Sequence, residues 1–236
     1  MKAVILNSGM GTRMGVETSL HPKCMTSLCG NETILSRQLR MLSKLGINEV
    51  VITTGYLRDV LISYCENLNC DVNIQYIHND KYDTTNYIYS LYLARNVIEE
   101  DILLLHGDLV FEESVLEDCI KNNMSCMVVD STIELPQKDF KAVICNGMIK
   151  KIGTQFFENA VAAQPMYKIT KEEWKKWLDA IVEACENGRN TCYAEDVYNL
   201  ISDICHIEPY NVKGKLCQEI DTLEDRNNIV RLLESN

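Results

Sequence analysis

The stretch AVILNSGMGTRMG at residues 3–15 combines an unbroken apolar run with a segment that holds three glycines. Apolar residues that follow one another without alternation are typical of a strand buried on both faces, as in a parallel sheet. The glycines that come next predict a loop, because glycine permits backbone conformations that other residues avoid. A glycine-rich loop after a first strand is a common place for a phosphate group. The stretch therefore indicates an α/β protein with an anion site near its N-terminus.

Strand and helix patterns alternate outward from this stretch, up to about residue 130. Apolar residues recur on one stripe of residues 34–45, and Gly46 stands where a helix commonly ends. Further helices are expected over 57–68, 86–97 and 112–122, and further strands over 49–54, 72–77, 102–105 and 125–130. This alternation predicts a mostly parallel sheet with helices on both faces. Residues 9–30 are broken by four glycines and Pro22, so we expect them to be irregular.

A different pattern follows residue 130. Strands over 141–145 and 148–152 flank Asn146-Gly147, which is a strong signal for a two-residue hairpin turn. Thr170 and Glu173 are expected to form a capping box that opens a helix of about 17 residues. The remaining predicted elements are a strand over 160–167, a helix over 195–204, an extended stretch over 206–212 and a final helix from about Thr222.

The composition excludes several classes of protein. Of 236 residues, 46% are hydrophobic and 24% charged, which argues against disordered and fibrous chains. The net charge of −11 argues against nucleic acid or an anionic membrane as a partner. Residues 1–60 nevertheless carry seven basic and four acidic side chains, which suits a small anion site there. The odd number of cysteines (11), with no signal segment or membrane-length apolar run, predicts a cytoplasmic protein with reduced thiols.

Two common phosphate-binding motifs do not fit the glycine-rich loop. A P-loop needs a lysine followed by serine or threonine after its last glycine, and this pair is absent. The dinucleotide fingerprint needs a glycine where this chain has Met14, and an acidic residue after the second strand, which ends in threonine. What remains is the pattern G-x-G-T-R at residues 9–13, followed by Pro22-Lys23.

This pattern resembles the G-x-G-[ST]-R…P-K pattern of nucleoside-triphosphate-dependent nucleotidyltransferases of the sugar-phosphate type. The stretch NDKYDTTNYIYSLYL at residues 79–93 looks very like bacterial CTP:phosphocholine and 2-aminoethylphosphonate cytidylyltransferases, and residues 219–221 are similar to their E-I-D signature. The resemblance runs from residue 1 to the last helix and is weakest over about 110–190. It implies a Rossmann-like, GT-A-like fold, in which a mostly parallel mixed sheet carries helices on both faces and the C-terminal half is elaborated.

The resemblance also implies an enzyme that transfers a cytidylyl group from CTP to a small phosphate or phosphonate and releases pyrophosphate. Phosphocholine and 2-aminoethylphosphonate are the favoured acceptors. We expect a single domain, residues 1–236, with a nucleotide-binding half (1–130) and an acceptor-binding and capping half (131–236). Two alternatives stay open: a sugar-1-phosphate uridylyl- or thymidylyltransferase, and an inactive nucleotide-binding regulatory module. The sequence also leaves open whether the chain forms a homodimer.

The resemblance gives roles to the loop and to two cations. Arg13 presents a fork of donors suited to the leaving phosphates, and Lys23 a point charge suited to the α-phosphate in the transition state. Both are expected to be catalytic. The residues expected to bind the nucleotide are Leu6, Asn7, Ser8, Gly9, Met10, Gly11, Thr12, Asn86 and Ser90. Asn86 could equally be the N-cap of a helix.

A metal site is implied at Asp108 and Asp221. Asp108 ends a predicted parallel strand, and carboxylates at such strand ends point into the ligand crevice. Mg²⁺ prefers one or two carboxylates together with phosphates, so the resemblance implies Mg²⁺ as cofactor. The family usually has an aspartate where this chain has His106. Asp221 has a competing interpretation, since Glu224 three residues later would suit a helix N-cap at Asp221.

The acceptor site is expected among tyrosines and acids. The chain has 11 tyrosines against four phenylalanines. Aromatic faces and carboxylates can together bind an ammonium group through cation–π contact and charge. We expect a cationic head group of the acceptor to contact Tyr89, Tyr193, Glu195 and Asp196. The two acids could equally form the solvated face of a helix.

Overall fold

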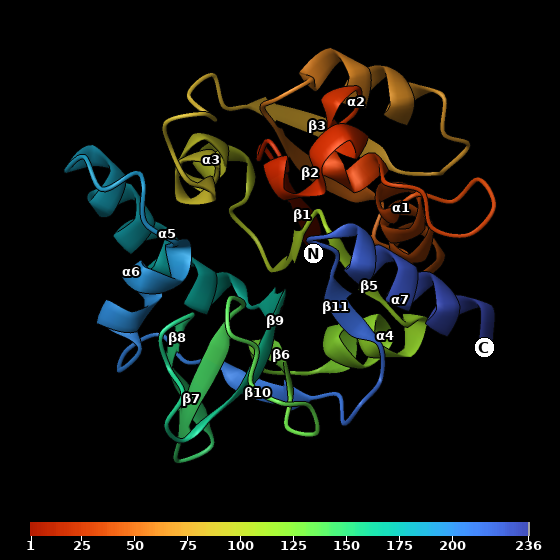
Figure 1. The fold of residues 1–236 in the computed structure, drawn as a ribbon. Helices are drawn as coiled ribbons and strands as arrows, with labels where there is room; N and C mark the ends of the chain where they lie inside the picture. Colours follow the sequence, from red (N-terminus) through yellow and green to blue (C-terminus); the bar gives the residue numbers. More distant parts are fainter. Residues whose placement is uncertain (236) are drawn as a thin grey trace.

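The computed structural model describes residues 1–235 (Figure 1). The strands are β1 (Lys2–Asn7), β2 (Glu49–Thr54), β3 (Asn73–His78), β4 (Ile102–His106), β5 (Leu109–Phe111), β6 (Cys126–Asp130), β7 (Lys141–Cys145), β8 (Met148–Gly153), β9 (Ala160–Ile169), β10 (Glu208–Asn211) and β11 (Cys217–Glu219). The α-helices are α1 (Ile34–Lys44), α2 (Arg58–Glu66), α3 (Tyr87–Ala94), α4 (Glu113–Lys121), α5 (Lys171–Glu186), α6 (Ala194–Ile201) and α7 (Leu223–Ser235). None of the helices in this range combines the length and the apolar character needed to cross a membrane.

The main sheet is mixed, with the strand order β10-β6-β9-β4-β1-β2-β3 and the β7-β8 hairpin joined to β9. β1 lies between β2 and β4 and is parallel to both, and β3 is parallel to β2. β9 is antiparallel to its neighbours β4 and β6. The predicted mostly parallel mixed sheet is confirmed, and its N-terminal half is the parallel part.

Helices cover both faces of the sheet, as predicted. Val4 and Leu6 of β1 pack on the face that α3, α5 and α6 cover. Ala3 and Ile5 pack on the opposite face, which α1, α2 and α4 cover. Successive side chains of a strand point to opposite faces, so an unbroken apolar run supplies both cores at once. A fully buried aliphatic side chain such as that of Val4 or Ile5 stabilises the fold by about 1.5–3 kcal/mol.

The hairpin predicted at Asn146-Gly147 is confirmed. Asn146 has φ 52° and Gly147 has φ 77°, so both central residues are left-handed, as a type I′ turn requires. The turn joins β7 to β8, which pair antiparallel. The hairpin continues the sheet beyond β9 (Figure 1).

Two local predictions are wrong. Thr170 and Glu173 form no capping box: the hydroxyl of Thr170 bonds to the Ser125 hydroxyl at 3.1 Å, and the Glu173 carboxylate accepts from the backbone N–H of His206 at 2.7 Å. Partners that are remote in the sequence therefore occupy the groups that local capping would use. The segment 9–30 is also less irregular than expected, because it contains 3-10 turns over Thr12–Ser19 and Lys23–Met25.

Two short strands that the patterns did not predict return the C-terminal segment to the centre of the molecule. β5 and β11 pair antiparallel, with Glu219 opposite Leu109. The N–H of Ile220 then donates to the carbonyl of Asp108 at 2.9 Å. In Figure 1, β11 and α7 lie beside β5 and α4. This pairing sets Asp221 next to Asp108.

Candidate active site

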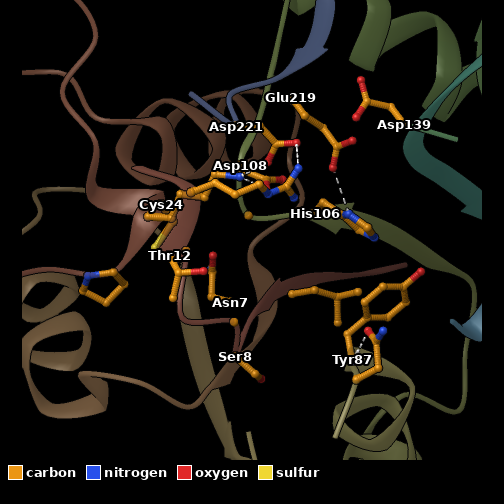
Figure 2. Close-up of a pocket in the computed structure, with 18 of the residues that line it drawn as sticks. Asn7, Ser8, Thr12, Cys24, Tyr87, His106, Asp108, Asp139, Glu219 and Asp221 are labelled. Atoms are coloured by element: carbon orange, nitrogen blue, oxygen red, sulfur yellow. Dashed lines mark hydrogen bonds and ion pairs between the residues drawn. The ribbon is translucent and has the colours of Figure 1, made fainter. Parts of the chain in front are cut away.

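A cavity of about 440 Å³ opens where the carboxyl ends of β1 and β4 meet the segment that follows β11 (Figure 2). Figure 2 shows the carboxylates of Asp108, Glu219 and Asp221 gathered at one end, with Asn7 and Tyr87 farther along the cavity. The strand order reverses between β1 and β4, and open α/β sheets bind ligands at such positions. The glycine-rich loop and both predicted cations line this cavity.

Two glycines let the loop lie close to its neighbours. Gly11 has φ 62°, and the Cβ of any other residue there would meet Cβ of Lys23 at 3.0 Å. Gly107 follows β4, and a Cβ at this position would lie 1.6 Å from Oδ1 of Asn7. Only glycine fits at such distances and, at Gly11, such a backbone conformation. The loop is therefore packed against the end of β4 and against the residue that carries the predicted catalytic ammonium group.

A chain of polar side chains supports the loop from behind. The hydroxyl of Ser8 accepts from the Ser90 hydroxyl at 2.9 Å, and Ser90 accepts from the Asn79 amide at 3.2 Å. Ser90, which was expected to bind the nucleotide, is fully buried behind Ser8. Asn86 lines the cavity and is also the N-cap of α3, since its side chain accepts from the N–H of Tyr87 at 2.7 Å.

Most of the residues predicted to bind the nucleotide line the cavity, but two of them do not. Those that line the cavity are Leu6, Asn7, Ser8, Gly9, Gly11, Thr12 and Asn86. Two predicted residues do not belong to the described cavity lining. Met10 is 39% exposed at the surface, and Ser90 is buried behind Ser8.

Both predicted cations pair with the predicted metal ligands. The ammonium group of Lys23 lies 2.6 Å from Oδ2 of Asp108 and 2.5 Å from Oδ1 of Asp221. Arg13 donates to Oδ2 of Asp221 at 2.5 Å. Burial alone would lower the pKa of Lys23, but the two carboxylates raise it above its usual value, so the group is charged. Burial would likewise raise the pKa of Asp108, but the charge of Lys23 lowers it below the usual range.

The donor set fits a divalent cation. Oδ1 of Asp108 is buried and has no hydrogen-bond partner among the described residues, which is unusual for a carboxylate oxygen. Lys23 bridges Asp108 and Asp221, so their carboxylates already meet around one positive charge. Carboxylate oxygens are the ligands that Mg²⁺ prefers. Asp108 and Asp221 therefore have donor atoms that fit a divalent cation.

Asp221 does not cap α7, so the competing interpretation of this residue is wrong. The carboxylate of Asp225 accepts from the N–H of Thr222 at 2.7 Å, and the Thr222 hydroxyl accepts from the N–H of Asp225 at 3.2 Å. This reciprocal pair caps α7. The side chain of Asp221 is left to the two cations.

His106 and Glu219 form a second polar pair in the cavity. Oε1 of Glu219 lies 3.1 Å from Nδ1 of His106, and each of them has a ligand atom within 4.8 Å of one of Asp108. Burial raises the pKa of Glu219 to about 7, and the charge of Asp108 adds to this shift. Burial alone would lower the pKa of His106, but Glu219 raises it overall. The sequence offered Glu219 only as part of a signature, because its contact with His106 depends on the β5–β11 pairing.

Three aromatic rings, Tyr87, Phe140 and Tyr193, line the cavity and are called the aromatic wall below. The ring centroids of Tyr87 and Tyr193 are 5.9 Å apart, and those of Phe140 and Tyr193 are 5.1 Å apart. His106 meets the Tyr87 ring edge-on at 4.9 Å. Only Tyr193 was predicted here. Tyr87 could have been suspected from its tyrosine-rich stretch, whereas Phe140 left no signal.

The structure corrects the expected places of Glu195, Asp196 and Tyr89. Glu195 is 1% exposed and accepts from the hydroxyls of Tyr87 and Tyr167, the latter at 2.7 Å. Asp196 accepts from the N–H of Tyr193 at 2.9 Å in the first turn of α6. Tyr89 stacks on a neighbouring ring of α3. Within the described chain, the cavity lining includes none of these three, because the turn of each helix points them elsewhere.

A buried lysine fixes the segment that carries part of the wall. Lys141 has no exposed surface, and its ammonium group donates to the carbonyls of Pro136 at 2.6 Å and Asp139 at 3.0 Å. It also lies 4.2 Å from the ring centroid of Phe157. Asp139 and its neighbour Phe140 line the cavity. Lys141 thus ties the backbone of this lining segment to the start of β7.

Comparison with known proteins gives one family and several relatives. Residues 3–135, more than half of the chain, match the family described as "MobA-like NTP transferase domain". CMP-5'-(3-aminopropyl)phosphonate synthase of Streptomyces rubellomurinus is 38% identical over 50% of this chain and 18% of that protein. CTP:phosphoglutamine cytidylyltransferase of Campylobacter jejuni is 29% identical over 59% of this chain and 57% of that protein. Choline-phosphate cytidylyltransferase of Streptococcus pneumoniae is 28% identical over 100% and 99% of the two chains.

Solved structures share the fold along the whole chain. The CTP:phosphocholine cytidylyltransferase from Streptococcus pneumoniae aligns with a TM-score of 0.81 at 21% identity, over 98% of both chains. The inositol-1-phosphate CTP transferase from T. maritima aligns with a TM-score of 0.75 at 22% identity, over 99% of this chain and 94% of that one. At these identities the likeness concerns the fold, and it confirms the predicted architecture.

Proposed function

The chain belongs to the MobA-like NTP transferase family, and from this premise we propose that it transfers a cytidylyl group from CTP to a small phosphate or phosphonate. One observation carries the proposal: Arg13, Lys23, Asp108 and Asp221 form a single ion network beside the glycine-rich loop. Relatives whose names specify cytidylyl transfer or a CMP product support the choice of CTP.

The proposed reaction is an in-line substitution at the α-phosphorus of CTP. An anionic oxygen of the acceptor forms a bond to the α-phosphorus while the bond from that phosphorus to the bridging β-phosphate oxygen breaks. Pyrophosphate leaves with the electron pair. Because the acceptor oxygen is already ionised, the step needs no general base, and catalysis depends on positioning and charge.

The residues of the network divide this work. Backbone N–H groups of residues 9–12 donate to the triphosphate, since glycines allow a close approach. Lys23 stabilises the negative charge that grows around the α-phosphorus. Arg13 holds the leaving pyrophosphate through its paired donors. Until the phosphates arrive, Asp108 and Asp221 keep Lys23 charged and held at the cavity.

Mg²⁺ is the proposed cofactor, and Asp108 and Asp221 would hold it. When bound, it supplies positive charge that neutralises the triphosphate and polarises the phosphorus. The unpartnered oxygen of Asp108 is the feature of this chain that supports the assignment. Lys23 and Arg13 then serve the phosphates directly.

The proposed acceptor carries a cationic head group, and phosphocholine and 2-aminoethylphosphonate are the leading examples. The aromatic wall offers ring faces for a cation–π contact. Asp139 and Glu219 line the same cavity and add carboxylates. An ammonium group loses hydration on binding and recovers that free energy from such partners. Names of two relatives, which specify an aminopropylphosphonate and choline phosphate, agree with this class.

A pyrophosphate-release screen tests the proposal. Four nucleoside triphosphates are crossed with phosphocholine, 2-aminoethylphosphonate, sugar 1-phosphates and a polyol phosphate, and each reaction has a control without acceptor. We expect release with CTP and an amine-bearing acceptor. Turnover of UTP or dTTP with a sugar 1-phosphate would contradict the proposal. Binding of CTP with no release for any acceptor would support an inactive regulatory module instead.

Replacing Lys141 with methionine should raise the KM for the acceptor by about tenfold and leave the KM for CTP nearly unchanged. Methionine fills a similar volume but leaves the carbonyls of Pro136 and Asp139 unpaired, and a lost buried hydrogen bond costs about 1–3 kcal/mol. Steady-state kinetics with either substrate varied would measure the split. Lys151→Met, at an exposed lysine of β8, is the matched control. Equal changes in both KM values would assign Lys141 to general stability alone.

A further inference from the structure

Glu195 is a buried carboxylate whose two oxygens accept hydrogen bonds from phenols rather than from a cation. The side chain lies in the first turn of α6, and both of its oxygens accept from tyrosine hydroxyls, Oε1 from Tyr167 at 2.7 Å and Oε2 from Tyr87. Among residues 1–235, no lysine, arginine or histidine forms an ion pair with it. The one nearby histidine whose raised pKa depends in part on Glu195, His106, pairs with Glu219 instead. A carboxylate buried without an ion pair of its own is costly, so its presence calls for an explanation.

The ring of Tyr87 separates Glu195 from the cavity. Tyr87 lines the cavity as part of the aromatic wall, while its hydroxyl points to Glu195. Burial and the neighbouring Glu195 raise the pKa of Tyr87 well above its usual value. The phenol is therefore protonated and donates to the carboxylate. The carboxylate of Glu195 therefore lies behind the Tyr87 ring that lines the cavity.

We propose that Glu195 sets the specificity of the aromatic wall, favouring a cationic head group over a neutral one of the same shape. The inference rests on the proposed function, because it concerns the acceptor of that reaction. A phenol that donates to a carboxylate gains electron density, and a more electron-rich ring attracts a cation more strongly. Glu195 is a positioning residue: it touches Tyr87 rather than the ligand.

Glutamine at position 195 separates charge from shape. Its amide oxygen can accept from one tyrosine hydroxyl and its amide group can donate to the other. The side-chain volume and the place of Tyr87 are therefore kept, and the negative charge is removed. If Glu195 had only a structural role, its replacement by glutamine would change kcat/KM by the same factor for cationic and neutral acceptors.

The test uses pairs of acceptors that differ only in charge. Phosphocholine is compared with 3,3-dimethylbutyl phosphate, and 2-aminoethylphosphonate with propylphosphonate. The readout is the ratio of kcat/KM for the cationic and the neutral member of each pair. In Glu195→Gln we expect this preference to fall about tenfold, with the KM for CTP and kcat/KM for the neutral members unchanged. Glu183→Gln, at an exposed site of α5, is the matched control and should keep the wild-type preference.

The outcomes separate this inference from the proposed function. A wild-type protein with no preference within either pair, or with no turnover of any member, overturns the cationic acceptor and the inference with it. A wild-type preference that persists in Glu195→Gln overturns the inference alone. Should circular dichroism show that Glu195→Gln does not fold, Tyr87→Phe keeps the ring and removes the hydroxyl that links it to Glu195. Loss of the preference in Tyr87→Phe supports the inference, and an unchanged preference overturns it.

Discussion

Lys23→Ala should lower turnover by about 10²-fold or more and leave the fold intact. The ammonium group of Lys23 lies at the centre of the ion network, within 2.6 Å of both Asp108 and Asp221. Its proposed role is to stabilise charge that grows in the transition state, and removal of such a group affects kcat more than binding of the ground state. Steady-state pyrophosphate release with saturating CTP and acceptor would measure the effect.

Lys44→Ala is the matched control for Lys23. Lys44 is an exposed lysine that pairs with Glu113 on the surface, and exposed pairs contribute little to stability. Circular dichroism of both variants in Mg²⁺ would show that each is folded. Turnover near the wild-type rate in folded Lys23→Ala would remove Lys23 from the mechanism and would leave Arg13 as the remaining cation of the network.

The order of strands and helices could be predicted where a strand buried on both faces requires a continuous run of apolar residues. Residues 3–6 form an unbroken apolar run because β1 lies at the centre of the sheet with a core on each side. β5 and β11 gave no such signal, because Leu109–Phe111 and Cys217–Glu219 are too short to display a period. Their pairing depends on contacts between segments more than 100 residues apart, which local patterns do not report.

The site could be predicted at strand ends but not where packing alone decides it. Asp108 stands two residues after the end of β4, so the strand itself sets its place at the crevice. Phe140 and Tyr87 enter the aromatic wall through the orientation of their rings, which depends on neighbours that are remote in the sequence. Glu195 was expected to reach the acceptor, but the turn of α6 points its side chain to the buried Tyr167 and the partly buried Tyr87 instead.

Asp108→Asn and Asp221→Asn should each lower kcat by about 10²-fold or more and raise the Mg²⁺ concentration needed for half-maximal rate. Asparagine keeps the size of the side chain but removes the charge that a divalent cation requires. It also removes one of the two carboxylates that hold Lys23. Initial rates over a Mg²⁺ titration would measure both effects, and binding of Mn²⁺ in the presence of CTP, followed by electron paramagnetic resonance, would report the metal site without turnover.

A variant of the helix cap distinguishes the proposed metal-binding role of Asp221 from a role in the stability of α7. Thr222 and Asp225 cap α7, so Thr222→Ala should lower the free energy of unfolding by about 1 kcal/mol and leave kcat unchanged. Asp221→Asn should lower kcat and leave the free energy of unfolding nearly unchanged, because the carboxylate of Asp221 binds the cations of the cavity and does not cap the helix. If Asp221→Asn kept wild-type turnover and wild-type affinity for Mn²⁺, Asp221 would not be a ligand. Glu219 would then be the candidate to replace it, since its carboxylate lies within 4.8 Å of a ligand atom of Asp108.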